Sequence, residues 1–182
     1  MALPLKILPR SLPAFVRKAV LAELFIATAD AFRCPAPQYR RLAYNECLLN
    51  YALFTRQQAE KAMRISSDVA SIKERLYLNA AELGKRARSW FALKSPDDVM
   101  SLGRVLYRSI GIEIEGSSDG SLIVNRCYFC RFYSPSVCDL ISALDDGVFS
   151  GLSGGGRLVF SQRITGRNSC CLARLIMKEN NQ

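Results

Sequence analysis

The spacing of apolar residues along the chain changes near residue 111, from a helical repeat to a strand repeat. Before that point apolar residues recur every three or four positions, and cap, proline and glycine residues divide the segment into four expected helices. We place these helices from Ser11 to Phe32, from Gln38 to about Ile65, from the cap Ser66-Ser67-Asp68 to about Leu93, and from Ser95 to Ile110. After that point Ile112-Glu113-Ile114-Glu115 alternates, and residues 122–124 resume beyond a turn, which predicts a β-hairpin.

A further helix and a second hairpin are expected after the first hairpin. Ser134-Pro135 is typical of a helix start, and this helix should run to about Phe149. Residues 156–164 and 169–177 predict two antiparallel strands around a turn at 165–168. The fold class is therefore α+β, with N-terminal helices packed on a C-terminal antiparallel sheet of about four strands and one helix between the two hairpins. We expect a single domain over residues 1–182, comprising a helical part (1–110) and a cysteine-containing part of sheet and helix (111–178).

The charge of the chain is strongly positive but dispersed. The 182 residues carry a formal net charge of +9, spread over short basic groups and single arginines rather than one long run. Solvated helix faces account for most of it, so we expect no nucleic-acid partner. The exception is the stretch 126–133, where aromatics lie between Arg126 and Arg131. The alternative to solvated faces is that these two arginines bind a small anionic ligand.

The chain contains seven cysteines and no histidine. Without imidazole, a nucleophile or metal site must rest on thiolates, carboxylates, hydroxyls or lysines. An odd number of cysteines without a recognisable signal peptide is typical of a reducing compartment, so we expect a cytoplasmic protein. The apolar segment 12–29 is interrupted by a proline and by charged residues, which predicts a buried or dimer-forming helix, and a homodimer, rather than a membrane span.

Three cysteines lie within twelve residues, at Cys127, Cys130 and Cys138. Cys127 and Cys130 follow a strand, and Cys138 lies near a helix start, so one loop could supply three ligands to a tetrahedral ion. Cys170 or Cys171 would be the fourth ligand; strand alternation places Cys171 on the helix-covered face, which favours it. Zinc and an iron-sulfur cluster use the same ligands. A redox-active Cys127/Cys130 pair and thiols that only fill the core, above all Cys34 and Cys47, are the alternatives.

Asp145 follows Cys138 by seven residues, two turns along the expected helix and on about the same face. Its carboxylate could therefore point toward whatever the cysteines bind, as a general base or an oxygen ligand. An exposed acidic side of the helix, shared with Asp139 and Asp146, is an equally common arrangement.

The segment from Leu106 to Leu175 resembles the L-2-amino-thiazoline-4-carboxylic acid hydrolase-like family and, more distantly, the 4-vinyl reductase domain. The resemblance rests on Tyr107 with Gly111, the strand 122–124 leading to Cys127, Cys138 with Asp145, and the glycine turn before Cys170-Cys171. It implies that Cys127, Cys138, Asp145 and one of the last two cysteines are site residues, and that helices pack against an antiparallel sheet. Ser142 replaces a cysteine frequent in the family, the acidic residue that often follows the last glycine is absent, and Cys130 is an additional thiol.

These observations lead to three expectations of function. The first is a small-molecule-binding or sensor domain whose cysteines hold zinc or an iron-sulfur cluster. The second is a metal-dependent hydrolase that opens a cyclic amidine such as a thiazoline carboxylate, with Asp145 as the base and Arg126 or Arg131 holding the substrate carboxylate. The third is a dimeric assembly module in which the cysteines are structural.

Overall fold

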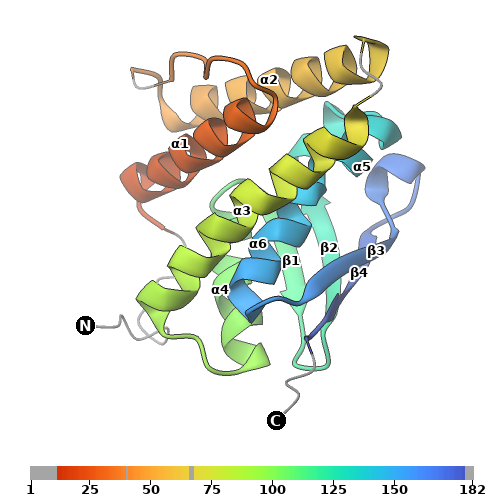
Figure 1. Ribbon diagram of the computed structural model, residues 1–182. Coiled ribbons are helices and arrows are strands. Elements are labelled where there is room, and N and C mark those ends of the chain that lie inside the picture. The colour runs from red at the N-terminus through yellow and green to blue at the C-terminus, as the bar shows by residue number, and fades with distance from the viewer. Residues whose placement is uncertain (1–11, 40, 66–67, 179–182) are drawn as a thin grey trace.

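The N-terminal half of the protein is helical, as the sequence predicted (Figure 1). The structure is a computed structural model that describes residues 12–39, 41–65 and 68–178. Its first four helices are α1 (Ala14–Ala31), α2 (Tyr44–Ile65), α3 (Val69–Phe91) and α4 (Pro96–Arg108). The expected caps at Ser11 and at Ser66-Ser67 lie outside the described residues.

The start of α4 agrees with the prediction from local sequence signals, whereas the start of α2 does not. Helix α4 begins with a capping box, in which the Ser95 hydroxyl accepts from the Asp98 backbone and the Asp98 carboxylate accepts from the Ser95 backbone. Helix α2 begins later than the expected Gln38, because the segment before it packs on α1: the ring of Tyr39 stacks on Phe25 at 4.9 Å. The Cys47 thiol of α2 also donates to the Tyr39 carbonyl oxygen at 3.3 Å.

The C-terminal half contains the expected antiparallel sheet of four strands. These are β1 (Ile112–Gly116), β2 (Ser121–Cys127), β3 (Arg157–Gln162) and β4 (Cys171–Ile176), in the order β1-β2-β4-β3. The two hairpins are confirmed, and they join through β2 and β4, where Val124 lies opposite Cys171. Pairing at this position brings the last strand next to the end of the strand that carries Cys127.

The segment expected as one helix between the hairpins is helical, with a one-residue interruption at Ser142. Helix α5 (Pro135–Ile141) and helix α6 (Ala143–Ser153) are separated at Ser142. The Ser142 hydroxyl donates to the Asp139 carbonyl oxygen at 2.9 Å and accepts from Nη2 of Arg163 at 2.9 Å. These contacts lie at the interruption, with Cys138 before it on α5 and Asp145 after it on α6.

Helices α3 and α6 lie side by side (Figure 1) at a distance that only glycine permits. A Cβ atom at Gly147 would overlap the Tyr77 carbonyl oxygen, and one at Gly151 would overlap the Ala81 carbonyl oxygen. This backbone contact fixes α6 against α3, and α6 in turn covers the inner face of the sheet.

The main core lies between that inner face and the helices. Alternate strand residues point into it, namely Ile112, Ile114, Leu122, Val124, Leu158, Cys171, Ala173 and Leu175. Within the described part of the chain, none of the helices has the length and apolar character needed to cross a bilayer.

Candidate functional site

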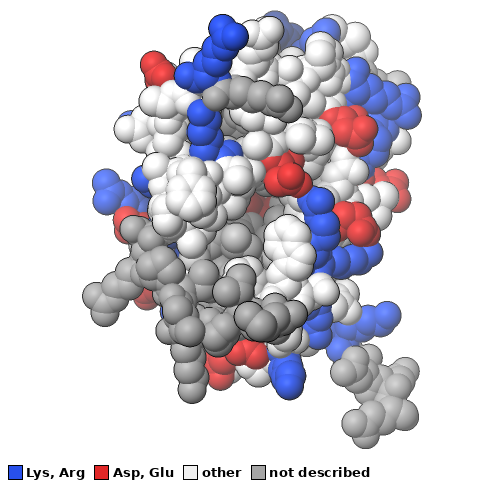
Figure 2. All heavy atoms as spheres, turned by 90° about the vertical axis from the view of Figure 1, so that its left-hand side faces the viewer, with Lys and Arg blue, Asp and Glu red and all other residues white. Residues whose placement is uncertain are grey.

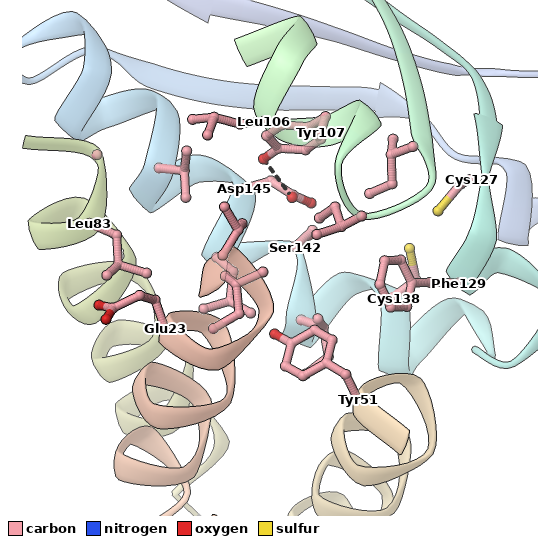
Figure 3. A pocket seen from close by; sticks show the side chains of 18 of the residues that line it. Glu23, Tyr51, Leu83, Leu106, Tyr107, Cys127, Phe129, Cys138, Ser142 and Asp145 are labelled. Atoms are coloured by element: carbon pink, nitrogen blue, oxygen red, sulfur yellow. Dashed lines mark hydrogen bonds between the residues drawn. The ribbon is translucent and has the colours of Figure 1, made fainter. Parts of the chain in front are cut away.

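A pocket of about 410 Å³ opens between the helices and reaches the end of the sheet (Figure 3). Helices α1, α3 and α4 form much of its wall, with side chains such as Val20, Leu83 and Leu106. The inner end is formed by β1, the end of β2, the following 3-10 turn, α5, α6 and the start of β4. The lining is mainly apolar, so the few polar groups in it stand out.

Asp145 is the acidic group at the inner end of this pocket. It lies in the first turn of α6, and its Oδ1 accepts a hydrogen bond of 2.7 Å from the Tyr107 hydroxyl, as Figure 3 shows. Asp145 lines the pocket and retains some accessible surface. Burial raises its pKa to about 6, although the bond from Tyr107 and the charge of Arg163 oppose the rise.

The three tyrosine hydroxyls near Asp145 are uncharged, and each has a hydrogen-bond partner. Tyr51 shares a hydrogen bond of 2.9 Å with Thr28, and Tyr133 bonds to the Thr55 hydroxyl. Burial raises the pKa of Tyr51, Tyr107 and Tyr133 above the ordinary value for tyrosine, so all three stay protonated. They therefore offer hydroxyl dipoles to the pocket but no charge.

Four of the five cysteines predicted as metal ligands line the same pocket: Cys127, Cys130, Cys138 and Cys171. The strand alternation expected for the last pair is confirmed, since Cys171 is buried beside Ala173 on the inner face. Cys170 lies outside the pocket lining, where its sulfur accepts from Nε2 of Gln162 at 3.5 Å.

The thiols of Cys127, Cys138 and Cys171 are protonated at neutral pH. Burial raises the pKa of Cys127 to about 12, against the opposing effect of the Phe129 and Cys130 backbone groups. Burial also raises the pKa of Cys138 and of Cys171. Metal ligation needs thiolates, and a buried neutral thiol behaves as a small apolar group with a weak donor.

The cysteine side chains that line the pocket are not grouped around one point. Across residues 12–39, 41–65 and 68–178, no three Cys, Asp or Glu side chains are grouped closely enough to hold one. The Cys130 thiol instead donates to the Cys127 carbonyl oxygen at 3.0 Å, and the Cys171 sulfur accepts from the Ile164 backbone at 3.3 Å. Ligation by zinc or by an iron-sulfur cluster stays a prediction, and it would require these side chains to turn toward one another.

The two arginines expected to hold an anionic ligand are not part of the pocket lining. Arg126 is 80% exposed and lies 3.6 Å from a carboxylate oxygen of Glu113 on the neighbouring strand. The guanidinium of Arg131 lies over the Tyr128 ring at 4.4 Å. Basic and acidic side chains are interspersed on the face of the molecule shown in Figure 2.

No local signal predicted that α1 and α3 would line the site, and Tyr107 was indicated only by the family resemblance. One signal was available for Tyr107: it lies on the buried face of α4 with Leu102 and Gly103. A buried tyrosine hydroxyl needs a hydrogen-bond partner, and the carboxylate of Asp145 provides one.

Chemically, the site combines an apolar cavity with a carboxyl group whose pKa of about 6 lies near neutral pH. Such a group can accept a hydrogen bond from a ligand, pair with a cation, or exchange a proton with a bound molecule. Compared with protein-family models and with curated proteins, the chain matches none.

Proposed function

We propose that this protein binds a small, largely apolar molecule in the pocket between α1, α3, α4 and the sheet. The observation that supports this function is the pocket itself, an apolar cavity with a few polar groups that converge on its inner end. This combination is typical of small-molecule sites, in which apolar walls supply affinity and a few polar groups fix orientation.

The size and the opening of the pocket fit such a ligand. Its volume of about 410 Å³ falls within the range of roughly 300 to 1,000 Å³ found for ligand pockets. The solvent side of the lining includes Trp90, which is 66% exposed. It also includes Glu23 and Arg86, which form an ion pair at 2.5 Å. A ligand would enter past these side chains and place its inner end near Asp145.

Binding of decanol, measured by isothermal titration calorimetry, tests this proposal. We expect saturable binding with a negative heat-capacity change, because apolar surface is buried. Ala19→Trp, at an exposed lining position of α1, should obstruct the pocket and weaken binding. Ala14→Trp, exposed on the same helix and outside the lining, is the matched control. Binding that is absent, or that both variants leave unchanged, would contradict the proposal.

Metal binding is a second candidate, favoured by the four thiols around one pocket. We expect zinc or iron with sulfide in anaerobically purified protein if Cys127, Cys130, Cys138 and Cys171 act together. Metal-free protein in which all seven thiols can be titrated would exclude this candidate. A hydrolase that opens a cyclic amidine also stays a prediction; it requires turnover that is lost in Asp145→Asn.

The homodimer expected from the apolar first helix stays a prediction as well. Phe15 and Ile26 on α1 are exposed, at 76% and 55%, so part of this helix is available for a partner. The mass of the protein in solution decides between a monomer and a dimer.

A further inference from the structure

We infer that the ligand of this pocket carries a positively charged amine at one end of its apolar body, and that the amine binds the carboxylate of Asp145. This inference rests on the proposed function, which supplies the apolar part of the ligand. It replaces the anionic ligand expected from the sequence with one of opposite charge.

Asp145 has no ion-pair partner among the described residues, unlike its acidic neighbours. Asp146 pairs with Arg157 at 2.8 Å, and Asp139 pairs with Lys73 at 2.9 Å. The charge of Arg163 lowers the pKa of Asp145. Its Nη2, however, lies 3.2 Å from a carboxylate oxygen of Asp139 and donates to the Ser142 hydroxyl. The charge of Asp145 is therefore left without a direct counter-ion.

The geometry leaves part of this carboxylate available to a ligand. Within the described residues, one hydrogen bond reaches it, from Tyr107 to Oδ1. Asp145 also lines the pocket and retains some accessible surface. An amine nitrogen placed there could donate to the carboxylate without displacing Tyr107.

The rest of the lining favours a cation over an anion. Apart from Arg86, which already pairs with Glu23, the described lining residues contain no lysine or arginine. The thiols of Cys127, Cys138 and Cys171 and the phenol of Tyr107 are protonated and uncharged at neutral pH. A ligand carboxylate would thus meet a like charge in a desolvated site, whereas an ammonium group would meet an opposite one.

The raised pKa of Asp145 also favours a cationic ligand. Its pKa of about 6 means that the ionised form is destabilised in the unliganded protein. A buried ionised group is costly unless a charged or hydrogen-bonding partner compensates it. A cationic amine supplies that compensation, which explains why a carboxylate can be placed in an otherwise apolar pocket.

Three probes with the same alkyl chain test the inference: decylamine, decanol and decanoic acid. Affinities are measured by calorimetry at about pH 8, above the pKa of about 6 of Asp145. We expect decylamine to bind roughly 10-fold to 100-fold more tightly than decanol, because a hydrogen bond to a charged group contributes that much. Decanoic acid should bind more weakly than decanol.

Asp145→Asn should reduce the affinity for decylamine to that for decanol and leave decanol unchanged. Asp146→Asn is the matched control, since Asp146 pairs with Arg157 and is not part of the lining; this variant should keep the preference for the amine. Equal binding of the three probes, or a preference that survives in Asp145→Asn, would overturn the inference while the proposed function stands. If none of the three probes binds, the proposed function fails together with the inference.

A measurement on the unchanged protein covers the case in which Asp145→Asn does not fold. The affinity for decylamine should fall as the pH is lowered through about 6, while that for decanol should stay constant. The titratable and charged groups that act on Asp145 from neighbouring elements are Tyr51, Tyr107, Cys127, Tyr133, Cys138, Asp146, Arg163 and Cys171. The tyrosines and these cysteines keep their protons, and arginine keeps its charge, throughout that range. A decylamine affinity that does not change with pH would therefore contradict the role of Asp145.

Discussion

The Tyr107 hydroxyl donates a hydrogen bond of 2.7 Å to Oδ1 of Asp145 and so joins α4 to the first turn of α6. The bond holds the carboxylate at the inner end of an apolar pocket. It also stabilises the ionised form of Asp145, in opposition to burial, which has the larger effect on the pKa. The predictions for these two residues follow from that balance.

Replacing Asp145 with asparagine should stabilise the protein above pH 6. The folded state holds the Asp145 proton up to a pKa of about 6, whereas the unfolded chain releases it near 3.8, so stability falls as the pH rises between these values. The penalty at higher pH is up to about 3 kcal/mol, and Asp145→Asn removes it while keeping an oxygen for Tyr107 to bond.

Urea unfolding of both proteins at a series of pH values measures this effect. The two free energies of unfolding should agree below about pH 4 and separate progressively toward pH 6. A variant that is less stable than the unchanged protein at neutral pH would contradict this prediction, because it would mean that the ionised carboxylate stabilises the fold. A stabilised variant that loses amine binding would show that Asp145 is retained for function at a cost in stability.

Tyr107→Phe should raise the pKa of Asp145 above 6, because the hydrogen bond that favours the ionised form is lost. The loss should cost about 1.5 to 3 kcal/mol where Asp145 is ionised and less where it is protonated. Carboxyl carbon chemical shifts followed against pH give the pKa directly. In Asp145→Asn the same tyrosine substitution should cost less, and a double-mutant cycle measures the difference. Costs that are equal in both backgrounds would mean that the two side chains are not coupled.

The fold class could be predicted because its signals are local. The alternation of Ile112 and Ile114 with polar residues, and the capping residues Ser95 and Asp98, act within a few positions of the chain. These signals do not depend on what packs against them, so the helical half, the two hairpins and the start of α4 agree with the structure.

The site could be predicted only in part, because its geometry depends on contacts distant in sequence. The break at Ser142 is held by Arg163, which follows it by 21 residues, and the wall from α1 and α3 depends on how those helices pack. Asp145 and Cys138 were expected to converge because they share one helix face; they converge on one pocket from two helices instead. Both residues therefore line one pocket, although the helical segment between them is interrupted at Ser142.

The thiol of Cys127 should be unreactive in the folded protein. A rise of its pKa from 9.0 to about 12 leaves about 1,000-fold less thiolate, and the greater nucleophilicity of that thiolate restores only part of the rate. We expect alkylation by iodoacetamide to be roughly 30-fold slower than in the urea-unfolded chain, as measured for the individual cysteine by mass spectrometry. Bound decylamine should slow it further, because Cys127 lines the pocket. Equal rates in folded and unfolded protein would exclude a buried, protonated Cys127.

Gly147→Ala should destabilise the protein by about 1 to 3 kcal/mol, through overpacking at the contact of α3 with α6. The added Cβ would overlap the carbonyl oxygen of Tyr77, a backbone atom that cannot move without shifting α3. Because α6 begins with the turn that carries Asp145, the shift should also weaken ligand binding. Gly166→Ala is the control: its Cβ would meet the flexible side chain of Asn168, and the change should stay within about 0.5 kcal/mol. Urea unfolding measures both variants, and a Gly147→Ala protein as stable as the control would mean that the helices are not in backbone contact.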